Sequence, residues 1–149
     1  MKKEIHIIYK EIETKDLARK LAQKILSEKT SQKPIVIGLL GDLGAGKTTF
    51  LQGFANGLGV KERVLSPTFV ILRKFKIKRR FFYHIDCYRL KSPKELLDLG
   101  FKEIIHNHLN IIAVEWADKV KKIMPKNSIW IKIDSMGENK RRIIIDKLC

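Results

Sequence analysis

Apolar and polar residues alternate with different periods along the chain, and each period predicts a different element. Continuous apolar runs at 35–40 and 111–115 are typical of strands that are buried on both faces of a parallel sheet. Residues 69–75 and 81–86 are aromatic and β-branched, which predicts a hairpin with the basic residues 76–80 as its turn. Shorter apolar stretches predict further strands, at 4–8, 129–133 and 142–145.

Helical spacing fills the segments between these strands. One helix is predicted with Thr14 as its N-cap and with an apolar face of Leu17, Ala18, Leu21, Ala22 and Ile25. A second helix is predicted over 48–58, with Gly59 as its C-cap glycine. The capping-box sequence Ser-Pro-Lys-Glu at 92–95 starts a third helix, which ends near Gly100. Because helices alternate with apolar strands, the pattern predicts an α/β fold.

Length and composition agree with one α/β domain. The 149 residues suit a single unit over 1–149, and an apolar share of 44% is enough for an ordinary core. The longest apolar stretch, 35–43, is far shorter than the roughly 20 residues of a membrane span, so no membrane partner is expected. Cys87 and Cys149 have no CxxC spacing and form no disulfide framework, which favours a reduced, cytoplasmic protein.

The chain carries a large positive charge. Its 31 Lys and Arg against 16 Asp and Glu give a formal net charge of +15. Six basic residues lie among the eight positions 73–80, and 140–142 form a second basic cluster. A coding bias toward lysine explains the scattered residues, whereas 73–80 is interpreted as a true basic patch. The charge therefore leaves a polyanionic partner such as RNA open.

A glycine-rich loop carries the most specific chemical signal. Residues 41–48 read GDLGAGKT and fit the phosphate-loop pattern GxxxxGK[ST], between a predicted buried strand and a predicted helix. In that context glycines let backbone N–H groups cradle phosphate oxygens, and the helix N-terminus adds its dipole. Lys47 is expected to reach the terminal phosphates, and Thr48 to place its hydroxyl on Mg²⁺. No N/TKxD box for guanine is present, which favours ATP as the nucleotide.

Two acidic residues end predicted strands and are candidates for the metal site. Asp86 ends one strand and Glu115 another, and ligands bind at the carboxyl ends of strands in α/β sheets. Either carboxylate could instead cap a helix or pair with a basic residue. Strand alternation places His84 on the face of Asp86 and Cys87 on the opposite face, which argues against a His–Cys nucleophile pair. His84 is thus a site residue or a core histidine, and Cys87 a small buried side chain.

Two further features have both a structural and a functional interpretation. Ser66, Pro67 and Thr68 form either a turn that enters a strand or a switch-like loop that senses the γ-phosphate or its metal. Trp116 follows Glu115 and is either a core residue or an anchor for a partner at the rim of the site.

Four motifs in a fixed order resemble a known family. They are GDLGAGKTT at 41–49, SPTF at 66–69, HIDCYRL at 84–90 and VEWA at 114–117, and the whole chain resembles the TsaE (YjeE) family of bacterial P-loop ATPases. The resemblance implies a P-loop NTPase-type three-layer fold, with a mostly parallel central sheet, an antiparallel hairpin and helices on both faces. It implies a cytoplasmic ATPase, slow alone and stimulated by a partner, that is needed for threonylcarbamoyladenosine modification of tRNA next to the anticodon. The implied partner is a TsaD–TsaB-like complex, through which the protein reaches tRNA.

The resemblance also assigns residues to the expected site. ATP is expected to contact Glu11, Gly137 and the loop residues Leu43, Gly44, Ala45, Gly46, Lys47, Thr48 and Thr49. Mg²⁺ is expected at Thr48, Glu115 and Asp86. The residues expected to act in hydrolysis are Lys47, Asp86, Glu115 and Thr68.

Two other functions stay open from the residues alone. A small-molecule or nucleotide kinase shares the phosphate loop but transfers phosphate to a second substrate, although no helical lid is evident after the loop. A basic RNA-binding module explains the charge but leaves the intact phosphate loop without a role.

Overall fold

The computed structural model describes residues 2–28, 33–64 and 71–147. The strands are β1 (Lys2–Ile8), β2 (Ile35–Leu40), β3 (Leu72–Ile77), β4 (Arg80–Asp86), β5 (Asn110–Glu115), β6 (Ile129–Ser135) and β7 (Arg141–Lys147). The helices are α1 (Glu11–Ser27), α2 (Lys47–Leu58), α3 (Pro93–Asp98) and α4 (Phe101–Ile104), with the 3-10 helix η1 (Ala117–Ile123). The alternation of strands and helices confirms the predicted α/β class.

The seven strands of the described chain form one mixed sheet in the order β1-β7-β6-β2-β5-β4-β3. β6, β2, β5 and β4 run parallel in its centre, whereas β3 at one edge and β7 and β1 at the other pair antiparallel. The predicted parallel centre and hairpin are confirmed, and the antiparallel group at the β1 edge adds to them. The carboxyl ends of β2, β5 and β4 therefore meet at one edge, where ligands bind in α/β sheets.

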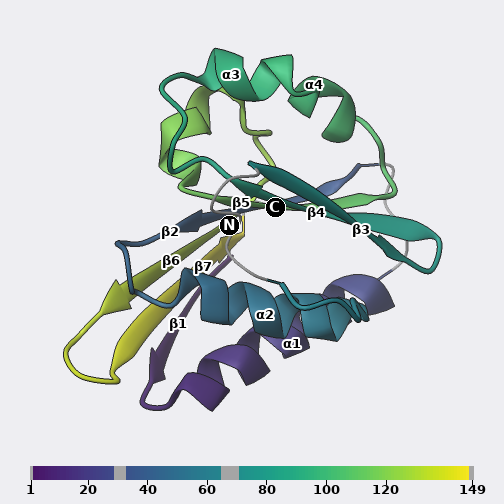
Figure 1. Cartoon of the computed structure of the whole chain (residues 1–149). Helices are drawn as coiled ribbons and strands as arrows, with labels where there is room; N and C mark the ends of the chain where they lie inside the picture. Colours follow the sequence, from purple (N-terminus) through teal and green to yellow (C-terminus); the bar gives the residue numbers. More distant parts are fainter. Residues whose placement is uncertain (1, 29–32, 65–70, 148–149) are drawn as a thin grey trace.

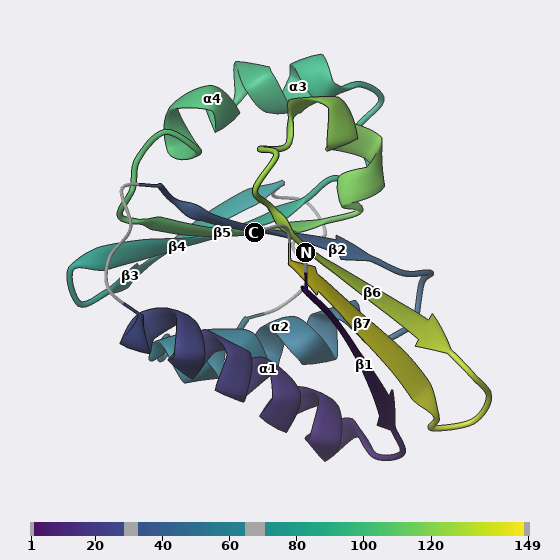
Figure 2. The ribbon, with the colours of Figure 1, turned by 180° about the vertical axis from the view of Figure 1, so that it is seen from behind.

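Helices cover both faces of the sheet and give the fold three layers, as Figures 1 and 2 show from opposite sides. α1 and α2 pack on one face, where the ring of Phe54 in α2 lies 5.9 Å from that of Phe82 in β4. α3, α4 and η1 pack on the other face around Leu96 and Phe101. Burial on both faces explains the uninterrupted apolar runs of β2 and β5. None of the helices in the described ranges is long and apolar enough to cross a membrane.

Two glycines allow α1 and α2 to approach each other closely. A Cβ at Gly53 would lie 2.4 Å from the carbonyl oxygen of Lys15, and a Cβ at Gly57 would lie 2.5 Å from that of Arg19. Both distances are shorter than any ordinary contact with a carbon atom. The backbone of α1 therefore packs directly against the glycine face of α2, which fixes the helix that begins at the phosphate loop.

The first helix begins earlier than its apolar pattern indicates. α1 starts at Glu11 with Lys10 as its N-cap, so the prediction of Thr14 as the cap is wrong, and Thr14 is buried within the helix. Glu11 and Glu13 lie in the first turn, where carboxylates interact favourably with the helix dipole. The Glu13 carboxylate also accepts the backbone N–H of Tyr9, at 3.2 Å. The only apolar residue of this first turn is Ile12, which is exposed, so the period of the buried apolar residues did not reveal the turn.

The hairpin has a tighter turn than predicted. β3 ends at Ile77 and β4 begins at Arg80, so the turn consists of Lys78 and Arg79 alone. The backbone reverses here because Lys78 has a φ of 49°, in the left-handed region. The predicted start of the first strand, at 69 and 70, lies outside the described residues.

The helix ends largely follow their predictions. Gly59 ends α2 with a φ of 89°, which confirms it as the C-cap glycine. Ser92 is the N-cap of α3 and Pro93 follows it, but no capping hydrogen bond comes from the Ser92 side chain. The Glu95 carboxylate instead accepts the backbone N–H of Lys91, at 3.3 Å, so the predicted capping box is only partly formed.

The close contact between α1 and α2 makes a prediction about stability. Gly53→Ala should destabilise the protein by about 1–3 kcal/mol, because the added methyl group collides with the backbone of Lys15. Alanine ordinarily stabilises a helix relative to glycine by about 1 kcal/mol. A loss of stability in Gly53→Ala would therefore indicate the close contact between the two helices. Urea unfolding measures the change, and Asn56→Ala, at an exposed position of the same helix, should stay within about 0.5 kcal/mol of the wild type. An unchanged or more stable Gly53→Ala protein would contradict this packing.

Candidate nucleotide-binding site

The loop between β2 and α2 has the backbone geometry that an anion requires. Gly44 and Gly46 have φ values of 77° and 109°, which suit glycine best. A Cβ added at either residue would meet no atom within 4 Å, so this side of the loop is open. A Cβ at Gly41, in contrast, would lie 2.6 Å from the carbonyl oxygen of Ile133. The loop therefore packs against β6 on one side and presents its backbone and the N-terminus of α2 on the other.

Lys47, the first residue of α2, folds back over this loop. Its ammonium donates hydrogen bonds to the carbonyl oxygens of Gly41 and, at 2.9 Å, Asp42. It also lies 4.3 Å from the centroid of the Trp116 ring, within the range of a cation–π contact. Burial lowers the pKa of the Lys47 ammonium, while the nearby carboxylates of Glu115 and Asp86 oppose this shift. The lysine thus stands between the loop and the acids.

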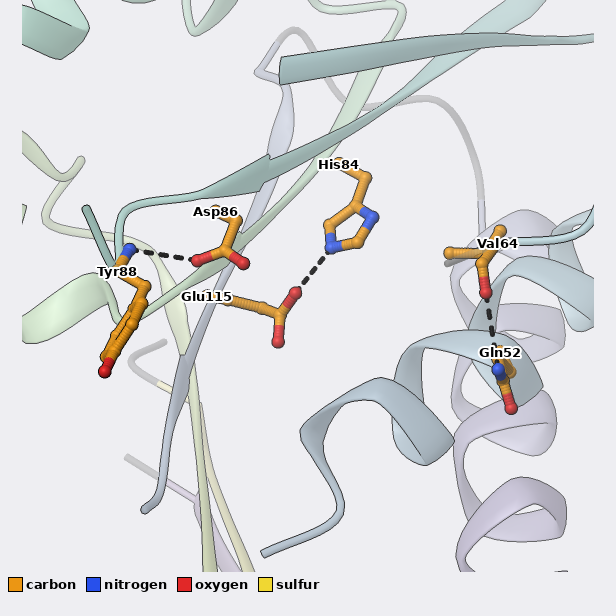
Figure 3. A network of polar contacts seen from close by, with 6 residues as sticks. All are labelled: Gln52, Val64, His84, Asp86, Tyr88 and Glu115. Carbon is orange, nitrogen blue, oxygen red and sulfur yellow. Dashed lines mark hydrogen bonds and ion pairs between the residues drawn. The ribbon is translucent and has the colours of Figure 1, made fainter. Parts of the chain in front are cut away.

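The two acids end neighbouring parallel strands in register. Asp86 of β4 lies directly opposite Glu115 of β5, which explains why residues 29 positions apart in the sequence meet. Glu115 is 3% exposed, and the imidazole Nε2 of His84 donates to its Oε2 at 2.7 Å (Figure 3). Asp86 accepts the backbone N–H of Tyr88 at 2.9 Å. His84 is therefore buried and is also bonded to a candidate site residue. The interpretations as a core histidine and as a site residue both apply to it.

A pocket of about 280 Å³ brings most of the predicted residues together. It is lined by Leu43, Gly44, Gly46, Lys47, Thr48, Thr49, Asp86, Tyr88, Glu115 and Trp116. A second pocket of about 260 Å³ shares the phosphate loop and adds the predicted residues Glu11 and Ala45. Gly137 lines neither pocket, but its carbonyl oxygen accepts a hydrogen bond from Arg141, which lines the second. Ser66, Pro67 and Thr68 lie outside the described residues.

Sequence reasoning missed Arg141, which joins the phosphate loop to the β6–β7 hairpin. Its Nε donates to the carbonyl oxygen of Ala45 at 2.9 Å, and Nη2 donates to that of Gly44 at 3.4 Å. Nη1 donates to the carbonyl oxygens of Gly137 and Lys140, at 3.2 and 3.0 Å. The sequence pattern places Arg141 only in a basic cluster, and it lies 96 positions from Ala45. No local sequence signal could reveal this contact.

Trp116 lines the first pocket and also packs against the core cluster that contains Leu96 and Ala117. It is half-buried, and its ring centroid lies 5.0 Å from that of Tyr88, which is exposed. Its φ of 56° is in the left-handed region, which a bulky residue rarely adopts. This conformation turns the chain from β5 into η1 while the indole stays beside Lys47.

The donor set fits a magnesium triphosphate. Thr48, Asp86 and Glu115 line one pocket and supply oxygen atoms, which are the ligands that Mg²⁺ prefers. Within the described ranges there is no group of three or more His, Cys, Asp or Glu residues placed to hold a metal ion. This also fits, because Mg²⁺ typically keeps waters and substrate phosphates instead of a complete protein cage. Leu43, Gly44 and Gly46 border the same space.

The arrangement of fold and loop defines the class of the protein. A central parallel sheet, a glycine loop from β2 into α2, and acids at the ends of the adjacent strands are the features of a P-loop protein of the NTPase type. The crystal structure of Bacillus subtilis YdiB has the same fold, with a TM-score of 0.77 and 30% sequence identity over 99% of this chain and 87% of that one.

Sequence comparisons then identify the family. The model of the family "Threonylcarbamoyl adenosine biosynthesis protein TsaE" matches residues 8–143. The tRNA threonylcarbamoyladenosine biosynthesis protein TsaE of Rickettsia felis is 40% identical over 137 residues, which are 91% of this chain and 75% of the relative. The protein of that name from Bacillus subtilis is 42% identical over 108 residues, 72% of this chain and 66% of the relative. The chain belongs to the TsaE family, which confirms the resemblance of its four motifs.

The burial of Cys87 makes a prediction about reactivity and its pH dependence. Burial raises the pKa of the Cys87 thiol from 9.0 to about 12, and the Asp86 carboxylate adds to this shift. At pH 8 the thiolate fraction should therefore be roughly a thousand times lower in the folded protein than in the unfolded chain. The stability contributed by the protonated thiol is present below about pH 9 and is lost as the pH rises toward 12.

Thiol labelling of a Cys149→Ser protein at pH 8 measures this difference, because Cys87 is then the only thiol. We expect slow labelling under native conditions and rapid labelling in urea. Rapid labelling of the folded protein would show that Cys87 is accessible and would reopen its interpretation as a nucleophile.

Proposed function

We propose that this protein binds and hydrolyses ATP at the phosphate loop and that this activity supports threonylcarbamoyladenosine modification of tRNA. The observation that carries the proposal is the convergence of Lys47, Thr48, Asp86 and Glu115 on one pocket beside an open glycine loop. The family supports the pathway, because its members are named for tRNA threonylcarbamoyladenosine biosynthesis.

Lys47 is poised to exchange its partners. Its ammonium is held by carbonyl oxygens of Gly41 and Asp42, and terminal phosphate oxygens would replace these neutral acceptors with charged ones. The ammonium already makes charge-assisted hydrogen bonds to the carbonyl oxygens, and phosphate acceptors add a direct attraction between opposite charges. The exchange therefore favours binding of a triphosphate, while backbone N–H groups of the loop and of the first turn of α2 hold the inner phosphates.

Thr48, Glu115 and Asp86 are the residues that would hold Mg²⁺. When bound, the ion would neutralise charge that develops on the β- and γ-phosphate oxygens. Oε2 of Glu115 is fixed by His84, which leaves the other carboxylate oxygen for the pocket. His84 is thus a positioning residue that restricts Glu115 to one orientation, as outer partners do for ligating carboxylates.

The partner in this proposal is a TsaD–TsaB-like complex, and the protein reaches tRNA through it. The described residues form one nucleotide-binding fold, and the proposed target of its activity is another protein. Among the described residues that line the first pocket, none is an obvious strong base for water, which supports slow hydrolysis until a partner completes the site. The proposed location is the cytoplasm.

Lys47→Ala tests the nucleotide site directly. The variant should lose at least about 100-fold in ATP affinity, because the charge-assisted hydrogen bonds to the terminal phosphates disappear. Titration calorimetry with ATP and Mg²⁺ measures the affinity, and Lys61→Ala, an exposed lysine beyond α2, is the matched control. Unchanged affinity in Lys47→Ala would remove the phosphate loop from the proposal.

Asp86→Asn and Glu115→Gln test the role of the two carboxylates in ATP hydrolysis. Both should reduce ATP hydrolysis by about 100-fold or more and change ATP affinity much less, because metal and water positioning matter most in the transition state. Release of free phosphate measures hydrolysis, which should be far below the median enzyme rate of about 10 s⁻¹ in the wild type alone. Asp98→Asn, at an exposed position in α3, is the control. Transfer of the phosphate to another molecule would favour the kinase instead.

Trp116→Ala tests the proposed docking site for the partner. Because Trp116 is half-buried at the pocket rim, the variant should fold, yet it should weaken binding to the TsaD–TsaB-like complex and reduce stimulated hydrolysis. Truncation of a buried aromatic residue costs about 3–5 kcal/mol, and Phe54→Ala provides that reference. Thermal melts and pull-down with the complex decide the outcome. Trp116 would not be a docking residue if Trp116→Ala lost as much stability as Phe54→Ala. The same conclusion would follow if a stable Trp116→Ala protein still bound the complex fully.

A further inference from the structure

The tip of the β3–β4 hairpin carries a positive surface that the nucleotide site does not use. We call it the cationic hairpin, and it consists of the exposed residues Arg73, Lys74, Lys76, Lys78 and Arg79. No Asp or Glu occurs in the sequence between Glu62 and Asp86. None of the salt bridges in the described ranges includes a residue of the cationic hairpin. The positive charge is therefore concentrated and is not neutralised within the described structure.

The register of the hairpin places cations and aromatic rings side by side. Lys74 lies opposite Tyr83, and Lys76 lies opposite Phe81, so all four belong to the same face of the two strands. The Lys74 ammonium lies 4.1 Å from the Phe81 centroid and 5.6 Å from that of Tyr83. Alternate residues of a strand are about 6.6 Å apart, so the lysines form a row rather than a single point of charge.

The remaining cations extend this row around the edge of the sheet. Arg73 points to the other face, with its guanidinium 5.1 Å from the ring of Phe75. Lys78 and Arg79 form the exposed turn. β3 is the last strand of the sheet among the described residues, and its face with Lys74 and Lys76 is exposed, whereas Phe75 and Ile77 on the other face are buried in the core. Arg80 is excluded from this set because its Nε donates to the carbonyl oxygen of Leu109, at 3.4 Å.

Protection of an open sheet edge is the simpler explanation for charged residues on β3. Lysines on edge strands prevent pairing with other chains. The opposite edge strand offers a comparison within the same molecule. There, Lys2 and His6 both pair with Glu4, so edge protection on β1 leaves little net charge. The cationic hairpin has five cations and no salt bridge within the described ranges, which is more net charge than the β1 edge carries.

We infer that the cationic hairpin binds RNA directly. A row of lysines and arginines matches the repeating charge of a phosphate backbone, and neighbouring aromatic rings are typical of surfaces that bind single-stranded segments. The choice of RNA over an acidic protein rests on the proposed role in tRNA modification. The inference goes beyond that role, in which tRNA is reached through the partner complex.

The RNA surface and the nucleotide pocket lie at opposite ends of β4. Asp86 ends this strand at the pocket, whereas the hairpin turn precedes its first residue, about 20 Å away for seven residues. Figure 1 shows the hairpin projecting from the sheet on the side away from the start of α2. Charge changes in the hairpin should therefore leave ATP binding intact.

Two triple variants with equal net charge test the inference. Lys74→Gln/Lys76→Gln/Lys78→Gln removes three charges from the cationic hairpin, and Lys121→Gln/Lys122→Gln/Lys126→Gln removes three exposed charges near η1. The probe is a fluorescent, unmodified transcript of a tRNA that reads a codon beginning with A. Fluorescence anisotropy without nucleotide, from 50 to 200 mM salt, gives the affinity and its salt dependence.

The hairpin variant should bind RNA at least about tenfold more weakly than the wild type, and the magnitude of its log–log salt slope should fall by about 2–3. The control should change less than about twofold. Equal losses in both variants would mean diffuse attraction by net charge and would overturn the inference, as would unchanged binding in the hairpin variant. If the hairpin variant lost the TsaD–TsaB-like complex but kept RNA, an acidic protein surface would be the ligand instead.

Calorimetry with ATP on the same proteins separates this inference from the proposed function. Unchanged ATP affinity in the hairpin variant shows that only the RNA surface was altered, whereas a wild type that binds RNA but no ATP contradicts the proposed function alone. If the triple variant melts at a lower temperature, Lys78→Gln/Arg79→Gln replaces it, because these turn residues lie beyond both strands. This variant removes two charges, so the magnitude of its salt slope should fall by about 1.4–1.8, and Lys121→Gln/Lys122→Gln is its matched control.

Discussion

Two cations hold the carbonyl oxygens of the phosphate loop, and the geometry of the site depends on them. The loop has no partner strand, so other groups must satisfy its peptide oxygens. Lys47 binds the oxygens at 41 and 42, and Arg141 binds those at 44 and 45. In a planar peptide the C=O and N–H groups point in opposite directions. The bond from Arg141 to the Ala45 oxygen therefore turns the adjoining N–H of Gly46 away from this cation, as an anion-binding loop requires, whereas the N–H of Ala45 donates to the Asp42 oxygen at 3.1 Å.

This constraint explains why the outer antiparallel strands matter to the site. Arg141 is the first residue of β7, and Gly41 packs against the backbone of Ile133 in β6. The β6–β7 hairpin thus supports the loop from one side, while α1 holds α2 from another through the close approach at Gly53 and Gly57. The parallel strands at the centre of the sheet supply the two carboxylates of the site, because their register places Asp86 beside Glu115. Sites built on several rigid elements in this way hold their side chains accurately.

The local parts of this architecture could be predicted from sequence, whereas the long-range contacts could not. The phosphate loop, the strands of the parallel centre and the two acids follow from motif, apolar runs and strand alternation, and the structure brings them to one pocket. Alternation also separates His84 from Cys87, but it could not show that His84 binds Glu115, because that bond depends on the pairing of β4 with β5. The contact of Arg141 with the loop spans 96 positions and has no local pattern.

A crystal structure with Mg²⁺ and an ATP analogue that cannot be hydrolysed at its γ-phosphate tests the central claim most directly. Our account predicts the triphosphate in the pocket lined by Asp86 and Glu115, with the Lys47 ammonium moved from the Gly41 and Asp42 oxygens to the terminal phosphates. Arg141 should keep its bond to the loop. A nucleotide bound elsewhere, or a triphosphate in this pocket with Lys47 still on its carbonyl partners, would contradict the account.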